Sequence, residues 1–388
     1  MSCCVVAFLS IAPGAAAGQD SAPGEPEIPA LFSSHEVIEF TIETDYGALR
    51  GDRKQDSEYR PAILTVTDDE GVARAIDIRV RTRGNYRLEN CRFLPLRVNF
   101  PRSRGGGTVF DGQNGLKLVS HCQDRDSDEQ NVLEEYLVYR TFNLLTDESF
   151  RVRLARVTYA DGEDDDDPVV QYAFFIEEAE AMAERLGALY LEIQQASPRN
   201  FGVAEAVRVA VFQYMVGNTD WSMVRFHNTE VLQNSEGVYV PVPYDFDWTG
   251  FVSARYARPD ERLGIGNVRQ RIYRGFCRPN FDTSTVYAQF LEIRAALEAL
   301  YTGQEGLWKR VMAGMPWNTS TTSTKISSPR KGPGVALREI AAICNPYCFL
   351  RPALGWSRYF HVSPRRTARI VLGETLRSLA QCPAALRQ

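Results

Sequence analysis

The stretch GNTDWSMVRFHNTEVLQNSEGVYVPVPYDFDW, residues 217–248, sets three acids and an amide around two short apolar segments. Asp220 and Asn228 precede TEVLQ, whereas Asp245 and Asp247 follow GVYVPV. The turn residues Asn-Ser-Glu-Gly between the two segments predict a β-hairpin. Asn and Asp are ordinary turn residues, so each of them alone indicates only a turn. Together, however, they follow the order that metal-assisted phosphoryl transfer uses: helix end, Asp, Asn, hairpin, Asp.

In that chemistry a loop Asp orients the acceptor hydroxyl, an Asn binds a metal ion, and the Asp after the hairpin holds Mg²⁺ against the phosphates. Carboxylate and amide oxygens are hard ligands that suit Mg²⁺. We therefore expect Asp220 in the catalytic position, Asn228 and Asp245 as metal ligands, and Asp247 as a further candidate ligand. A glycosidase-type acid pair, such as Asp220 with Asp245, is the enzyme alternative, but it leaves the Asn and the hairpin unexplained.

The periodicity of the chain changes near residue 178. Before it, apolar residues alternate with polar ones, as in ARAIDIRVRT (73–82), which predicts half-buried antiparallel strands. One helix, in SDEQNVLEEYLVYRTFNLL, interrupts these strands. After residue 178 the pattern becomes helical, and VAEAVRVAVFQYMVG ends at Gly217. We expect an α+β chain with a sheet-rich half at 35–178 and a mostly helical half at 179–388, the latter holding the loop and hairpin of 217–248.

A lysine inside an apolar strand is a candidate contact for nucleotide phosphates. NGLKLVSHC places Lys117 in mid-strand, and the helix that follows carries Glu134 and Glu135. A buried Lys is costly unless it is paired, so we expect a helix Glu, preferably Glu135, to face it. A Lys on the wet face of an edge strand is the alternative. The segment joining the two halves would lie beside adenine, with backbone groups from Ile176 to Glu178.

Two arginines and an asparagine lie shortly before Cys91. Arg83, Asn85 and Arg87 fall within RTRGNYR, shortly before Cys91. Guanidinium forks match phosphate oxygens, so these side chains could contact a phosphate. An ordinary turn with solvated charges is the alternative, and the sequence slightly favours it.

The N-terminus predicts export. Residues 1–18 hold a short apolar run followed by small residues, as in a secretory signal, and 19–34 form a Pro/Gly/Ser-rich linker. No later stretch approaches 18 apolar residues, so we expect no transmembrane segment and a periplasmic or extracellular location. The net charge of −5 gives no electrostatic reason for a nucleic-acid partner.

Cysteine usage agrees with export. Six cysteines follow the signal: Cys91, Cys122, Cys277, Cys344, Cys348 and Cys382. An even number in an exported protein predicts up to three disulfides, although spacing does not fix their pairing. Cys91 with Cys122 is the preferred pair because each lies beside an expected strand of the same half. A zinc site is the alternative, but the chain has no CxxC pair and its four His residues are far apart.

Four segments together resemble the CotH (spore coat protein H) kinase-like family, and in particular its exported bacterial relatives of unassigned function. They are RTRGNYR (81–87), NGLKLVSHC (114–122), GNTDWSMVRFHN (217–228) and PVPYDFDW (241–248). The first is similar to that family's RGN motif, and GNTD and YDFD also resemble catalytic segments of HipA-type Ser/Thr kinases. The resemblance implies a protein-kinase-like two-lobe fold, with an antiparallel sheet-rich N-lobe and a mostly helical C-lobe.

The resemblance also implies ATP and Mg²⁺ as cofactors and a hydroxyl acceptor on a protein Ser/Thr or a small molecule. Asp220 would be the catalytic Asp, Asn228 and Asp245 the metal ligands with Asp247 as a possible substitute, and Lys117 the phosphate-binding Lys. Asn228 follows Asp220 by eight positions, whereas kinase catalytic loops have about five. No GxGxxG precedes Lys117 either. A non-catalytic pseudokinase-type binding protein is therefore the rival hypothesis, and Mg-ATP binding and phosphate transfer distinguish the two.

Overall fold

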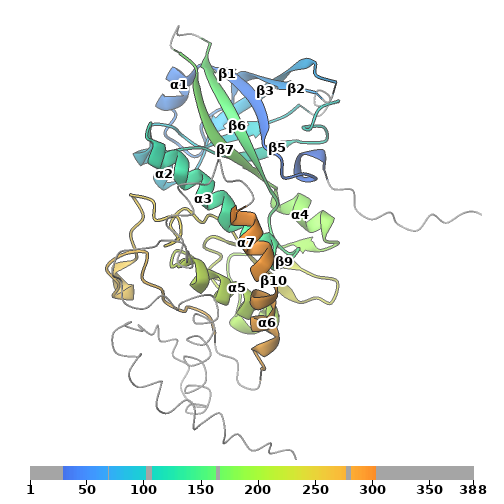
Figure 1. The fold of residues 1–388 in the computed structure, drawn as a ribbon, viewed down its shortest axis with the longest axis vertical. Coiled ribbons are helices and arrows are strands. Elements are labelled where there is room, and N and C mark those ends of the chain that lie inside the picture. Colours follow the sequence, from blue (N-terminus) through green and yellow to red (C-terminus); the bar gives the residue numbers. More distant parts are fainter. Residues whose placement is uncertain (1–28, 69, 102–106, 163–166, 277–280, 303–388) are drawn as a thin grey trace, which may run out of the picture.

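The structure is a computed structural model that describes residues 29–302, apart from 69, 102–106, 163–166 and 277–280 (Figure 1). The expected signal at 1–18 and most of the expected linker lie outside the described residues. So do Cys277, Cys344, Cys348 and Cys382. The part of the chain that the structure describes contains both halves of the predicted site.

Seven strands close into a barrel in the order β1-β2-β3-β4-β5-β7-β6. They are β1 (Ile38–Thr44), β2 (Arg60–Thr67), β3 (Ala73–Thr82), β4 (Leu96–Asn99), β5 (Gly115–Val119), β6 (Val152–Asp161) and β7 (Val169–Ile176). All neighbouring pairs are antiparallel except β1 and β6, whose parallel pairing closes the barrel. The expected antiparallel strands are thus confirmed. The parallel pair of β1 with β6, which closes the barrel, was not predicted.

The barrel interior is filled by the apolar residues that alternate along its strands. Ile76, Ile78 and Val80 of β3 are buried, as the period of two predicted. A short 3₁₀ helix, Ala30–Phe32, adds Leu31 and Phe32 to the same core, so the last residues of the expected linker are packed against the barrel.

The predicted disulfide between Cys91 and Cys122 is confirmed. It joins the end of α2 (Tyr86–Asn90) to the segment that follows β5. Arg53, which follows α1 (Tyr46–Gly51), donates to the carbonyl oxygens of Leu88 and Cys91 at 2.7 and 2.8 Å. Because α2 is too short to be stable by itself, these links hold it in place.

The remaining described chain mixes helices with a small sheet. It comprises α3 (Asp126–Asn143), α4 (Ala179–Arg185), β8 (Leu189–Tyr190), the 3₁₀ helix Pro198–Asn200, α5 (Val203–Val216), β9 (Thr229–Gln233), β10 (Tyr239–Pro243), the 3₁₀ helix Glu261–Leu263, α6 (Ser284–Glu292) and α7 (Arg294–Thr302). Strands β9 and β10 form the predicted hairpin, with β8 as a third strand. Helix α5 ends at Gly217, whose φ of 70° suits the expected glycine C-cap.

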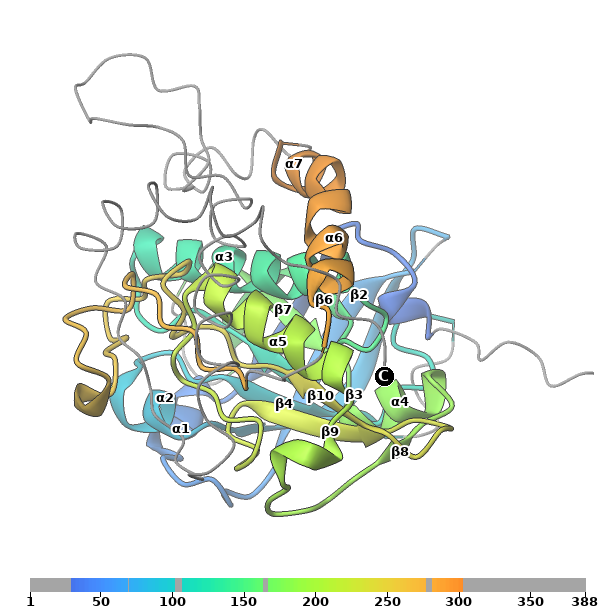
Figure 2. The ribbon, with the colours of Figure 1, turned by 90° about the horizontal axis from the view of Figure 1, so that it is seen from below.

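The predicted protein-kinase-like two-lobe fold with a mostly helical C-lobe is wrong. The sheet-rich half is a closed seven-stranded barrel of mixed pairing, and the other half contains a three-stranded sheet within its described residues. The two halves also share one core, because α3, β6 and β7 pack with α5 and the hairpin in a single apolar cluster. Figure 1 shows α3 between the barrel and α5, and Figure 2 shows α3 running beside α5. The rings of Phe142 and Phe212 join these helices at 4.6 Å.

Candidate functional site

A cleft of about 340 Å³ lies where the barrel meets the hairpin. This volume is at the lower end of the range of small-molecule sites. Its lining includes seven of the predicted site residues: Lys117, Glu135, Ile176, Asp220, Asn228, Asp245 and Asp247. Segments separated by more than a hundred positions therefore meet in one place. Of the predicted set, Glu178 does not line this cleft.

The loop after α5 brings Asp220 and Asn228 together despite their long separation. Ser222 and His227 form an antiparallel bridge, with backbone hydrogen bonds of 2.9 and 3.2 Å, so the intervening residues fold back on themselves. Nδ2 of Asn228 donates to the backbone oxygen of Asp220 at 2.7 Å and to its Oδ2 at 3.1 Å. The extra residues thus form a closed turn, and they do not separate the acid from the amide.

His227 is a site residue that the sequence reasoning missed. Its Nε2 is hydrogen-bonded to Oδ1 of Asp220 at 2.8 Å, and this bond raises the pKa of His227. Both carboxylate oxygens of Asp220 therefore have a partner within the loop. A His seven positions after an Asp carries no distinctive signal, and only the Ser222–His227 bridge places it there.

The two acids after the hairpin differ in their surroundings. Asp245 is exposed, has a φ of 60°, and donates its backbone N–H to the Tyr139 hydroxyl at 2.8 Å. Asp247 is 6% exposed; its Oδ2 accepts from the Tyr256 hydroxyl at 2.8 Å and lies 3.4 Å from Nε of Arg87. Asp245 is consequently open to a ligand, whereas Asp247 is held by protein groups.

Burial makes the deeper acid hard to ionise. Desolvation and the nearby charge of Asp245 raise the pKa of Asp247 to about 7, although Arg87 acts in the opposite direction. Glu135 behaves alike, because burial raises its pKa well above the usual range while Arg87 lowers it. Both carboxyls lie at the floor of the cleft, around one guanidinium.

Glu135 faces Arg87, not Lys117 as predicted. Its Oε2 lies 3.7 Å from Nη2 of Arg87. Burial alone would lower the pKa of Arg87, but Tyr256, Asp247 and Glu135 together raise it. The solvated-turn interpretation of Arg87 is therefore wrong. We refer to Arg87, Glu135, Asp247 and Tyr256 as the floor network.

Lys117 lines the cleft from the outer face of β5. Its strand lies between β4 and β7, so the edge-strand alternative is wrong. Its Nζ lies 5.7 Å from the centre of the Tyr244 ring, and among the described residues it forms no ion pair. Burial is the main cause that lowers its pKa, and Arg83, which also lines the cleft, contributes. Cations from the barrel thus face acids from the hairpin side.

The expected adenine segment is mostly engaged within the protein. Ile176 is paired with Lys117 on one side and Val152 on the other. The carboxylate of Glu178 is bound to Arg97 through two hydrogen bonds of 3.1 and 2.8 Å. Of the segment 176–178, only Ile176 therefore lines the cleft.

The residues present are suited to Mg²⁺. Because Nδ2 of Asn228 is bound to Asp220, the amide oxygen is left for a cation, and the Asp245 carboxylate is exposed beside it in the cleft lining. Mg²⁺ typically keeps several waters and takes one or two carboxylates. Within the described chain, no group of three His, Cys, Asp or Glu side chains forms a metal site. An Asn–Asp pair with waters requires no such group.

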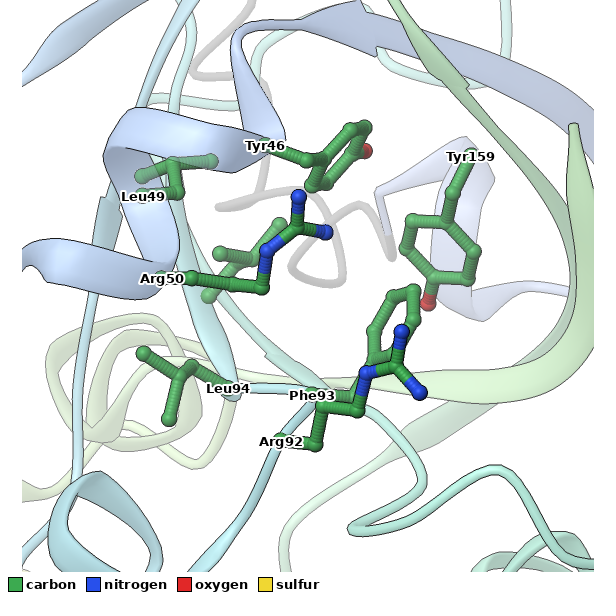
Figure 3. A pocket seen from close by; sticks show the side chains of 8 residues that line it. Tyr46, Leu49, Arg50, Arg92, Phe93, Leu94 and Tyr159 are labelled. Atoms are coloured by element: carbon green, nitrogen blue, oxygen red, sulfur yellow. The ribbon is translucent and has the colours of Figure 1, made fainter. Parts of the chain in front are cut away.

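A second cavity, of about 20 Å³, lies at one end of the barrel. Tyr46, Phe93 and Tyr159 form its apolar walls, and Arg50 and Arg92 reach over it (Figure 3). The volume suffices for about one water molecule. We therefore place the candidate site in the larger cleft.

No protein-family model matches the chain, and no curated protein matches it. Among the described helices, none has the length and apolar character needed to cross a membrane. The geometry of the larger cleft therefore carries the functional conclusion.

Proposed function

We propose that this protein binds Mg-ATP in the larger cleft and transfers a phosphoryl group to a hydroxyl acceptor, as the resemblance to the CotH kinase-like family implies. The observation that supports this best is the convergence of Lys117, Asp220, Asn228 and Asp245 on one cleft. Phosphoryl transfer depends mainly on positioning and on charge stabilisation, which such a cleft can supply. It does not require a two-lobe kinase fold, because function belongs to the site.

Each side of the cleft has its own role in this proposal. The Asp245 carboxylate and the Asn228 amide oxygen hold the metal, which neutralises charge on the phosphate oxygens when bound. Lys117 and Arg83 bind the phosphates from the barrel side. Asp220 orients the acceptor hydroxyl. The hydroxyl replaces the His227 ring as the hydrogen-bond partner of the Asp220 Oδ1 atom. The half-exposed His227 side chain has room to move away.

The nucleobase takes a different place from the expected one. Tyr86 and Trp248 both line the cleft, and Tyr86 is 38% exposed. Their ring centres lie 5.5 Å apart, and Tyr86 packs on Tyr256 of the floor network at 5.3 Å. Bases stack well on such anchored aromatic rings. We therefore assign the base to the rings of Tyr86 and Trp248 and not to the backbone after Ile176.

Export is part of the proposal. The Cys91–Cys122 disulfide supports it, because disulfides persist chiefly in oxidising compartments. The acceptor is then a protein or small molecule that carries a hydroxyl in the periplasm or outside the cell.

Two measurements test the proposal. Mg-ATP should raise the melting temperature by a few degrees; Asp245→Ala should abolish that rise, whereas Asp260→Ala, at an exposed acid outside the cleft lining, should retain it. Transfer of labelled phosphate should be lost in Asp220→Ala while the rise persists. If the parent protein shows no rise, nucleotide binding is excluded. A rise without transfer to any acceptor would favour the non-catalytic binding protein.

A further inference from the structure

A row of cations lies on the outer face of the barrel, next to the cleft. We call Arg79 and Arg81 of β3, Arg97 of β4 and Lys117 of β5 the cationic strip. Arg81 is the direct cross-strand partner of Arg97, and Arg97 is that of Lys117. Such partners on one face of a sheet have Cβ atoms about 5 Å apart. Three like charges therefore lie abreast, and Arg79 follows two residues along the same face of β3.

The alternation of the strands fixes this orientation. Val80, Val98 and Leu118 point into the barrel and are fully buried. Their neighbours in the strands must point outward, because successive side chains alternate between the faces. The strip therefore lies outside the barrel core; Arg79 is exposed, and Arg81, Arg97 and Lys117 are half-buried.

The arginines of the strip are held in place by Tyr59. Its ring centre lies 4.9 Å from Cζ of Arg81 and 5.5 Å from Cζ of Arg79. Tyr59 also contributes to the raised pKa of Arg97, after burial, which lowers it, and the larger effect of Glu178. Cation–π contacts of this kind order the guanidinium groups. A ligand would consequently meet side chains that have already lost most of their freedom.

The strip has fewer acids than cations beside it: Glu178 at Arg97, and Asp77 two residues before Arg79 on the same face of β3. Glu178 on Arg97, at 2.8 Å, is its one ion pair within the described chain. Burial lowers the pKa of Lys117, and the charges of Arg83 and Arg97 lower it further, against the opposing effects of Glu178 and Glu230. Like charges directly opposite one another destabilise a sheet. An anion bound to the strip would therefore offset a repulsion that the fold contains.

We propose that the cationic strip docks an acidic segment of a polypeptide, whose Asp or Glu side chains bind its arginines. Guanidinium forks match carboxylates in a two-point contact. The strip crosses three strands at about 4.8 Å spacing, so it is about 10 Å wide and accommodates two or three carboxylates. Its four cations are fewer than the about 6–10 phosphate contacts of a strongly salt-dependent nucleic-acid complex.

The strip leads to the candidate site. Lys117 belongs both to the strip and to the cleft lining, so a segment docked on the arginines passes the mouth of the cleft. The docked polypeptide would then present the acceptor hydroxyl beside acidic residues. That role rests on the proposed phosphoryl transfer, whereas the docking itself does not.

Fluorescence anisotropy with a fluorescein-labelled oligoglutamate peptide tests the docking. The parent protein should bind it, and an oligoglutamine peptide of equal length should not bind. Arg81→Glu should weaken binding at least about tenfold, and Arg81→Gln should weaken it less. The matched control is Arg74→Glu, an equal change of charge on the same strand at an exposed residue that pairs with Asp68; it should stay within about twofold. Glu178→Gln should strengthen binding, because it frees Arg97.

Three outcomes would overturn the proposal: no binding of oligoglutamate by the parent, equal losses in Arg81→Glu and Arg74→Glu, or tighter binding of a single-stranded DNA oligonucleotide. The melting temperature of each variant shows whether it is folded, and the milder Arg81→Gln serves if Arg81→Glu unfolds. A parent that binds oligoglutamate without a melting-temperature response to Mg-ATP would refute the proposed function alone. A response to Mg-ATP without peptide binding would refute only the docking.

Discussion

The floor and the rim of the cleft use the same kinds of residues in opposite ways. At the floor, Arg87 is enclosed by Glu135, Asp247 and Tyr256, so its guanidinium is engaged within the protein. At the exposed edge of the cleft, which we call the rim, Asp245 keeps an exposed carboxylate in a left-handed backbone conformation. A buried charge that loses its partner destabilises a fold, whereas an exposed charge without a protein partner can bind a ligand. The comparison assigns the floor to stability and the rim to function.

The largest effect is expected from Arg87→Met, which breaks the floor. Removing the guanidinium leaves Glu135 and Asp247 buried without their cation, so the free energy of unfolding should fall by about 3–5 kcal/mol. Urea denaturation measures this change. Arg92→Met, which removes an exposed ion pair with Asp124, is the control and should cost no more than about 1 kcal/mol. Equal costs for the two variants would show that the floor network is not a stabilising unit.

A pH titration of stability sharpens the comparison further. The pKa of Asp247 is raised from its ordinary value of 3.8 to about 7, so the folded protein holds this proton where the unfolded chain has released it. Its contribution to stability is therefore present below about pH 4 and is lost as the pH rises to about 7. Melting temperatures of the parent and of Asp247→Asn should diverge across this window. The melting temperature of the parent should fall relative to that of the variant as the pH rises. Parallel curves would contradict a raised pKa.

A smaller and opposite effect is expected at the rim. Asp245→Gly relieves a left-handed conformation that a non-glycine residue adopts at a cost of about 1 kcal/mol, so stability should rise by about that amount. The melting-temperature response to Mg-ATP should be lost in the same variant. A loss of stability here would show that the Asp245 side chain supports the fold, and the contrast with the floor would then disappear.

Local patterns predicted the elements, and long-range pairing decided what they build. The hairpin and the glycine end of α5 follow from neighbouring residues, and the Cys91–Cys122 pair from the strands beside which the two cysteines lie. The parallel pairing of β1 with β6 joins segments more than a hundred positions apart and leaves no local trace, so the barrel was missed. The partner of Glu135 was missed for a similar reason. Lys117 lies in the middle of β5 and Arg87 in the short helix α2, and only the folded structure shows which of these two cations the acid meets.

The bridge between Ser222 and His227 also bears on how such sites can be recognised. Because the loop closes on itself, its two ends remain neighbours whatever the length between them. Residues could be added or removed at its tip without moving Asp220 away from Asn228. A motif defined by a fixed distance along the chain would therefore pass over this arrangement. A motif defined by the hydrogen bonds that join the loop's ends would find it.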